Sequence, residues 1–120
     1  NRGQNVLYAT DNGKIEQGRN YVADGDRFHT KSVGSFPPTP LDLYDLMGNS
    51  SEWVRDPYSI NYYRKSPERN PEGPQQGELH VVRGGTFLDA PESNTTTFRG
   101  KHKELQFYSE LYGFRCAANI

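Results

Sequence analysis

Cysteine, long apolar runs and an excess of either charge are all scarce in this sequence of 120 residues. The single cysteine, Cys116, cannot form a disulfide within the chain, so the sequence is no disulfide scaffold by itself. No apolar stretch approaches the roughly 20 residues that a helix needs to cross a bilayer. The net charge of −1 provides no field that would steer the chain towards nucleic acid or a membrane surface. We therefore expect no nucleic-acid partner and no membrane span.

Apolar residues are also few, at 32% of the sequence, whereas glycine, proline and tyrosine number 12, 8 and 8. This composition is too poor in apolar residues and too rich in aromatics for a helical bundle. It favours one small domain with short strands, long loops and an aromatic core.

Alternating apolar residues and flanking turn residues predict short strands at residues 5–10, 51–58, 79–85, 95–101 and 112–119. A helical turn is expected around Ile60–Arg64. The long segments 17–40 and 58–78 are polar and rich in turn residues, and they have no helical period. Loops of this length are uncommon in a compact domain unless something pins them. Bound ions, a buried hydrogen-bond network or a further portion of the protein could do so.

The stretch LDLYDLMGNSSEWVRDPY, residues 41–58, combines the only tryptophan and the only methionine with acidic residues around a Gly-Asn turn. Gly48 permits left-handed backbone, and Asn49 adopts it with little strain. The acids on either side of this turn, Asp45 and Glu52, are seven residues apart. The sequence therefore predicts a sharp turn that brings two carboxylates together.

Such a turn would gather oxygen atoms and so offer a site for a hard cation. Calcium binds about six to eight oxygens from carboxylates, amides and carbonyls. The candidate ligands are two side-chain carboxylates and two backbone carbonyls, which belong to Asp45, Gly48, Ser50 and Glu52. The alternative is that an acid caps the turn or pairs with Arg55.

The motifs LYDLMGNSSEWVRDPY, NPEGP, HVVRGGTF and YGFRCAAN occur in that order, and SVGSFPPTPLDLYDL precedes them. Their joint occurrence resembles the formylglycine-generating enzyme family, also called sulfatase-modifying factor domains. The resemblance covers roughly Asn20 to Ile120. It implies an α+β fold of the loop-rich, C-type-lectin-like kind, with short antiparallel strands and little regular secondary structure.

The resemblance also implies calcium at the stretch 41–58, with the candidate ligands named above. Ser51 stands where the family usually has tryptophan, so a packing aromatic is missing. A possible second calcium site lies upstream, and its ligands would be Asn20, Tyr21 through its carbonyl, Asp24 and Asp26. The alternative for the two aspartates is a solvated turn. Calcium sites favour an extracytoplasmic location.

Active members of this family hold copper with two cysteines that follow the R-G-G motif, and they oxidise a substrate cysteine to formylglycine. The corresponding stretch here, RGGTFLDAPESNTTTFRGK, contains no cysteine, and Asp89 and Asn94 stand near where the pair would be. Oxygen ligands do not suit Cu(I). We therefore expect no copper and no copper-dependent oxidase activity. Cys116 is expected in a buried strand, and the resemblance implies a cysteine partner in the N-terminal half.

Family domains are longer than this chain, and the resemblance implies that residues 1–120 form the C-terminal portion of one domain. The N-terminal portion, or a second copy, would then complete the core.

The sequence leaves two candidate functions. One is a calcium-stabilised module without catalysis that binds a protein, peptide or glycan. The other is an oxidoreductase that acts on a siderophore or thiol precursor, with part of its active site upstream; the histidines present, His29, His80 and His102, form no close metal pair in the sequence.

Overall fold

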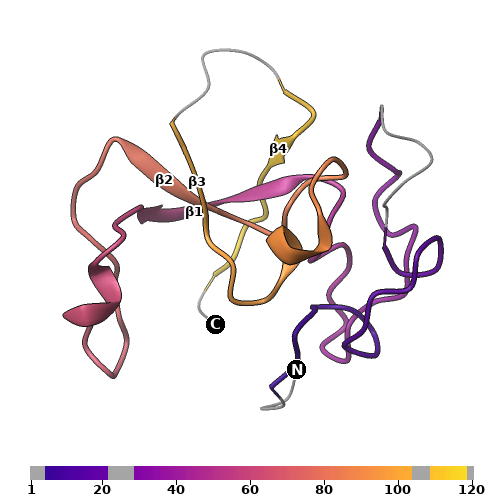
Figure 1. Ribbon diagram of the computed structural model, residues 1–120, viewed down its shortest axis with the longest axis horizontal. Coiled ribbons are helices and arrows are strands. Elements are labelled where there is room, and N and C mark those ends of the chain that lie inside the picture. The colour runs from indigo at the N-terminus through magenta and orange to yellow at the C-terminus, as the bar shows by residue number, and fades with distance from the viewer. Residues whose placement is uncertain (1–4, 22–28, 104–108, 119–120) are drawn as a thin grey trace.

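A small four-stranded sheet lies at the centre of the molecule, and loops surround it (Figure 1). The computed structural model describes residues 5–21, 29–103 and 109–118. The strands are β1 (Ser51–Pro57), β2 (Leu79–Arg83), β3 (Gly100–Lys103) and β4 (Tyr112–Gly113). Two short 3-10 turns, η1 (Tyr62–Arg64) and η2 (Pro91–Asn94), are the helical elements of the described residues. No helix in these parts of the chain is long and apolar enough to cross a membrane.

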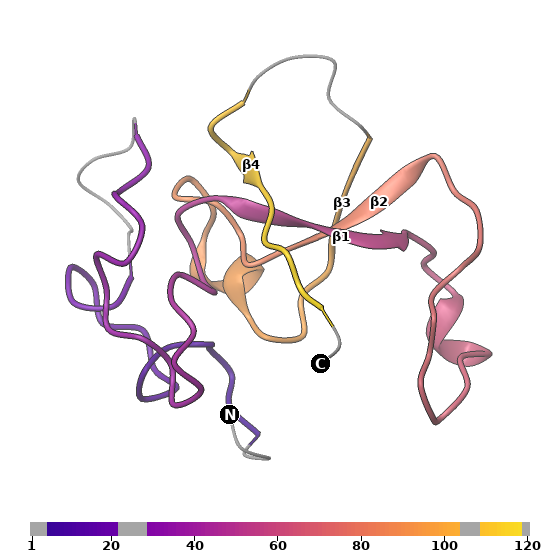
Figure 2. The ribbon, with the colours of Figure 1, turned by 180° about the vertical axis from the view of Figure 1, so that it is seen from behind.

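The strands lie in the order β3-β2-β1-β4. β1 pairs antiparallel with β2, and β2 pairs antiparallel with β3, in which His80 lies opposite His102. The register of β1 shifts between Trp53 and Pro57, which marks a bulge-like irregularity. β4 pairs parallel with β1, at the edge of the sheet opposite β3. Figure 2 shows the C-terminal segment passing in front of β1.

The sheet is strongly curled. Side chains from its two edge strands, β3 and β4, meet across its face. The rings of His102 on β3 and Tyr112 on β4 have centroids 4.5 Å apart. Trp53 on β1 lies beside both, with centroid distances of 6.1 Å to His102 and 5.8 Å to Tyr112. This half-buried aromatic cluster fills the concave face of the sheet.

The buried apolar side chains of the described residues are Tyr21, Met47, Val81, Val82 and Phe87. Val81 and Val82 are neighbours on β2 and so lie on opposite faces of the sheet. Buried polar residues, including Asn20 and Asn94, accompany these side chains. The core therefore joins the N-terminal loops to the segment after β2, and a polar network contributes to it, as expected for loops that must be pinned.

The strands predicted at 51–58 and 79–85 are confirmed as β1 and β2, and η1 lies at the predicted helical turn. The predicted strand at 5–10 is wrong, since no strand forms there. Instead, the carbonyls of Val6 and Leu7 accept hydrogen bonds from Thr96, at 2.8 and 2.9 Å. A loop rather than a neighbouring strand supplies their partners.

The last two predicted strands are displaced or shortened. β3 begins at Gly100 rather than at residue 95, after the bend that follows η2. β4 ends at Gly113, so the expected buried strand around Cys116 is wrong, and Cys116 is exposed. The reason is that a side-chain ion pair, rather than a strand ladder, holds the chain beyond Gly113.

Candidate functional site

The predicted Gly-Asn turn is present, with Gly48 and Asn49 both in left-handed backbone at φ 72° and 64°. Asn49 uses its side-chain amide to hold a distant segment. Its Oδ1 accepts from the Lys31 backbone N at 2.8 Å, and its Nδ2 donates to the Lys31 carbonyl at 3.2 Å. The Gly48 N–H donates to the Gly84 carbonyl at 2.8 Å. The turn is therefore fixed against the loop after β2 and against the segment near residue 31.

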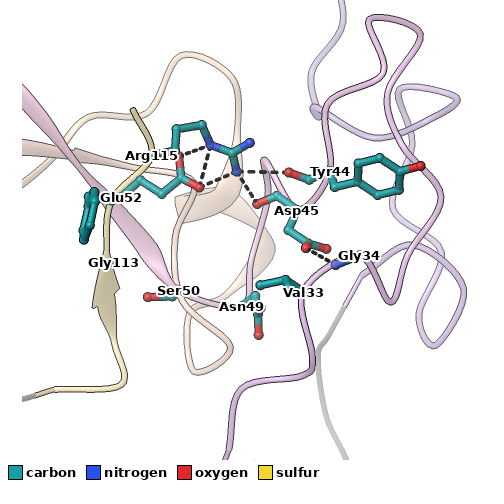
Figure 3. Close-up of a pocket in the computed structure, with 10 residues that line it drawn as sticks. Val33, Gly34, Tyr44, Asp45, Asn49, Ser50, Glu52, Gly113 and Arg115 are labelled. Atoms are coloured by element: carbon teal, nitrogen blue, oxygen red, sulfur yellow. Dashed lines mark hydrogen bonds and ion pairs between the residues drawn. The ribbon is translucent and has the colours of Figure 1, made fainter. Parts of the chain in front are cut away.

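Asp45 precedes this turn and also has left-handed backbone, with φ 53°. Its carboxylate Oδ2 accepts a hydrogen bond of 2.6 Å from the Gly34 backbone N. Aspartate tolerates this backbone region better than most residues because its short polar side chain can bond locally. The carboxylate thus lies at the rim of a cavity, where Figure 3 shows it turned towards Gly34.

Glu52, on β1, forms a two-pronged ion pair with Arg115 beyond β4 (Figure 3). Arg115 Nε donates to Glu52 Oε1 at 2.9 Å and to Oε2 at 2.7 Å, and Nη2 also contacts Oε1. Nη2 further donates to the carbonyls of Tyr44 at 3.0 Å and Asp45 at 3.4 Å. The hydrogen bond to Glu52 raises the pKa of the Arg115 guanidinium above its ordinary value. Arg55, which the sequence suggested as a partner, is exposed.

These groups line one cavity of about 540 Å³ that includes Asp45, Ser50, Glu52 and Arg115. Gly48 is not among its lining residues. No group of three or more His, Cys, Asp or Glu side chains that could hold a metal gathers within the described parts of the chain. A cation here would therefore depend on carbonyl and hydroxyl oxygens besides the two carboxylates. Oxygen atoms are the donors that calcium prefers, but Arg115 occupies both carboxylate oxygens of Glu52 in this structure.

The upstream residues of the possible second calcium site have other partners. Asn20 is buried; its Oδ1 accepts from the Glu16 N–H at 2.8 Å and its Nδ2 donates to Asp11 Oδ1 at 2.9 Å. The Tyr21 side chain belongs to the core. Asp24 and Asp26 lie outside the described residues. Asn20 therefore organises its own loop, and the second site stays a prediction.

Asp89 and Asn94, near where copper-binding cysteines would stand, both take part in polar networks. Asp89 Oδ2 accepts from the Thr86 backbone N at 2.7 Å and from its hydroxyl at 2.9 Å. Asn94 is 2% exposed, and its Nδ2 donates to the Ala90 carbonyl at 3.0 Å and to the Tyr21 hydroxyl at 3.2 Å. Asn94 Oδ1 has no hydrogen-bond partner among the described residues. These side chains are therefore structural parts of the loop that follows β2.

Asn94 also explains one glycine of the R-G-G motif. An added Cβ at Gly85 would lie 2.1 Å from Asn94 Oδ1, and Gly85 has φ 71°. Glycine is thus required there by both space and backbone conformation. The pairing of Tyr21 with Asn94 could not be predicted from the sequence, because the two residues are 73 positions apart and no local signal links them.

A cavity of about 260 Å³ lies on the concave side of the sheet, next to Asp89. Its other polar lining residues include Thr86, Ser93, Lys101 and Tyr112. Burial raises the pKa of the Tyr112 hydroxyl above its ordinary value. The cavity therefore combines the Asp89 carboxylate with the Tyr112 phenol, whereas the Lys101 Nζ lies over the Tyr58 ring, 5.4 Å from its centroid.

Together, the curled sheet, the scarcity of helix and the long pinned loops define a loop-rich domain of the C-type-lectin-like kind. The family model of the Sulfatase-modifying factor enzyme 1-like domain matches residues 3–120. The chain belongs to this family, which is the formylglycine-generating enzyme family.

Individual relatives agree with this assignment. The chain is 40% identical over 110 residues to the formylglycine-generating enzyme of Streptomyces coelicolor. The matched region covers 86% of this chain and 34% of that enzyme. It is 39% identical over 93 residues to the serine/threonine-protein kinase pkn1 of Chlamydia pneumoniae. The matched region covers 76% of this chain and 15% of that kinase. The structure of PvdO from Pseudomonas aeruginosa is similar with a TM-score of 0.69 and 25% identity, over 90% of this chain and 42% of that one. The chain thus spans only part of the length of each relative.

Proposed function

We propose that this chain is a calcium-stabilised domain of the family that serves as a binding or accessory module and does not carry out copper-dependent formylglycine formation. The observation that carries this proposal is the chemistry of the loop after β2. Asp89 and Asn94 stand near the expected cysteine positions, and no cysteine occurs between Gly85 and His102. Their oxygen atoms suit neither copper(I) nor its redox chemistry.

The proposal of calcium rests on the oxygen atoms at the cavity beside β1. The carboxylates of Asp45 and Glu52 line it together with Ser50. Calcium held there would neutralise the two carboxylates and join the segment before β1 to β1 itself. The resemblance adds the Gly48 carbonyl to this set. A calcium-dependent domain of this kind suits an extracytoplasmic location, where a protein, peptide or glycan would be its ligand.

Calcium should raise the melting temperature of the chain, and EDTA should lower it again. A ligand that binds only the folded state stabilises it by about 2.7 kcal/mol when present at a hundredfold excess over its Kd. The difference in melting temperature between calcium and EDTA should shrink in Glu52→Gln, which removes one carboxylate charge. Glu68→Gln is the matched control, because Glu68 is exposed in a loop away from the cavity. Identical melting curves of the natural chain with and without EDTA would contradict the proposal.

Copper(I) should bind weakly, and a cysteine-containing sulfatase peptide should stay unconverted. The measurements are a competition titration with a copper(I) chelator and mass spectrometry of the peptide. The double variant Asp89→Cys/Asn94→Cys provides the comparison, since two thiolates at these positions should restore tight copper(I) binding. A tight one-to-one copper(I) complex of the natural chain, or an aldehyde in the peptide, would overturn the absence of oxidase activity.

A second candidate function is an oxidoreductase of the same family that acts on another substrate, of the siderophore-precursor or thiol-precursor type. The cavity of about 260 Å³ supports it, because Asp89 and Tyr112 both line this cavity. Further active-site residues would come from the N-terminal portion. Metal analysis of the longest natural chain discriminates between the two functions: bound iron would favour the enzyme, whereas calcium alone would favour the binding module.

A further inference from the structure

Arg99, the residue before β3, lies against two tyrosine rings of the loop that follows β1. Its Cζ is 4.2 Å from the centroid of the Tyr63 ring and 5.3 Å from the centroid of the Tyr58 ring. Lys101 shares the Tyr58 ring with it, because its Nζ is 5.4 Å from the same centroid. The negative face of an aromatic ring attracts such cations. The start of β3 and the loop after β1 therefore form one cationic and aromatic cluster.

The guanidinium of Arg99 has no hydrogen bond or ion pair with the residues that the structure describes. Arg83 differs, because its Nη1 donates to the carbonyls of Thr96 and Phe98 at 3.3 and 2.6 Å. Stacking on a ring occupies a face of the guanidinium and leaves the N–H donors in its plane available. The cluster is also open to solvent, since Tyr63 is 65% exposed. Arg99 therefore presents an oriented fork of free donors, which matches a carboxylate.

Arg99 also lines a cavity of about 150 Å³ beside this cluster. Pockets for drug-sized molecules have about 300–1,000 Å³, so this cavity suits a single side chain. The charged lining residues are Arg83, Arg99 and Asp56, and together they leave a net positive charge. The Asp56 Cγ is 2.7 Å from the position that a Cβ on Gly73 would take, so this carboxylate packs against the opposite loop. The apolar lining residues are Val54, Pro57, Pro71, Pro74 and Val81.

We infer that this face binds a peptide in which a carboxylate side chain lies next to an apolar one, with the carboxylate on Arg99 and the apolar group in the cavity. This rests on the proposed function, because it names the ligand class of the binding module. Charge complementarity selects the carboxylate, and the apolar lining selects the neighbouring side chain. A sulfated glycan matches the face less well, because it has no apolar side chain to fill the cavity.

The binding of a labelled peptide, GSELGSELGS, to the chain or to its complex with the N-terminal portion can be measured by fluorescence anisotropy. Arg99→Gln should weaken this binding about tenfold or more, because it removes a charge-assisted, two-pronged hydrogen bond. Arg99→Lys keeps the charge but loses the fork, so its affinity should be intermediate. Tyr63→Leu should weaken binding about threefold, because Tyr63 positions the guanidinium. Since Tyr63 is largely exposed, this variant tests the cluster even if Arg99→Gln does not fold.

Two peptides and one variant serve as matched controls. GSQLGSQLGS lacks the carboxylate and GSEGGSEGGS lacks the apolar side chain, so each should bind more weakly than GSELGSELGS. Arg69→Gln should bind like the natural chain, because Arg69 is exposed and does not line the cavity. Equal affinity of the natural chain and a folded Arg99→Gln variant, or of GSELGSELGS and GSQLGSQLGS, would overturn the assignment of the carboxylate to Arg99.

Two further outcomes separate this face from other ligands and from the proposed function. A sulfated oligosaccharide that binds more tightly than the peptide, and does so through Arg99, would assign the face to a glycan and overturn the peptide ligand. The melting and copper tests do not involve Arg99. Peptide binding without calcium stabilisation would therefore leave this inference standing, whereas calcium stabilisation without peptide binding would overturn this inference alone.

Discussion

Tyr21 shows how much of the polar architecture depends on one residue. Its side chain is 1% exposed, and its hydroxyl donates to the Asp89 carbonyl at 3.0 Å while accepting from Asn94 Nδ2 at 3.2 Å. The hydroxyl thus links the N-terminal loop to the loop after β2. Burial raises the pKa of Tyr21 above its ordinary value of 10.0, with Asp89 and other nearby groups adding to the shift. The folded state therefore favours the protonated phenol.

Tyr21→Phe should reduce the free energy of unfolding by about 1–3 kcal/mol, because the Asp89 carbonyl and one N–H of the Asn94 amide lose their hydroxyl partner. The raised pKa has a second consequence. Its contribution to stability is complete below pH 10 and is lost as the pH rises above that value, so the natural chain should lose stability in alkali.

Tyr21→Phe should lack the part of the loss of stability in alkali that comes from the Tyr21 hydroxyl. Urea unfolding at about pH 7 and about pH 11 measures both effects. Tyr63→Phe is the control, since Tyr63 is 65% exposed. Equal alkaline losses in the natural chain and in Tyr21→Phe would contradict the assignment.

At the scale of elements, the curl of the sheet depends on close contact between β2 and β3. Gly100 on β3 lies opposite Val82 on β2. A Cβ at Gly100 would lie 2.7 Å from Cγ2 of Val82, which is itself buried in the core. Glycine at this position therefore allows the edge strand to approach its neighbour and the concave face to form.

Gly100→Ala should destabilise the chain by about 1–3 kcal/mol, because the added methyl group overpacks the contact with Val82. The matched control is Gly113→Ala on β4, where an added Cβ would meet its nearest atom, Ser50 Oγ, at 3.4 Å. Chemical denaturation of both variants measures the difference. A Gly100→Ala variant as stable as Gly113→Ala would show that the two strands can separate at no cost.

At the scale of the whole molecule, large apolar side chains remain in contact with solvent. Val33 is 88% exposed and Phe114 79%, and the two residues line the same cavity. The core is small, and the chain covers 34% of the Streptomyces coelicolor relative and 15% of the Chlamydia pneumoniae one. Exposed apolar surface of this kind is typical of a face that another segment covers. These observations support the proposal that the N-terminal portion of the domain, or a second copy, is a partner.

The isolated chain should therefore be less stable than the complex and should self-associate, and co-expression with the N-terminal portion of the domain should yield a soluble one-to-one complex. Light scattering and denaturant unfolding measure the two properties, with an unrelated domain as the co-expression control. The implied pairing of Cys116 with an upstream cysteine would appear in the same complex as a disulfide under oxidising conditions. A monomeric chain that unfolds cooperatively by itself would refute the need for a partner.

Features that rest on neighbouring residues could be predicted from the sequence. Gly48 and Asn49 have the left-handed backbone that their side chains permit, and alternating residues produced β1 and β2. The ordered motifs indicated the family, and the absence of cysteine between Gly85 and His102 is a property of the sequence alone.

Contacts between distant groups follow from the path of the chain in three dimensions. Glu52 pairs with Arg115, which is 63 residues away, rather than with nearby Arg55, and the Tyr21 hydroxyl bonds to Asp89 across 68 residues. The failed strand at residues 5–10 has the same origin, because its alternating pattern lacks a neighbouring strand in space. Hydrogen bonds and ion pairs depend on distances of a few ångströms between atoms. Those distances follow from the path of the whole chain and from the curl of the sheet, which no local pattern encodes.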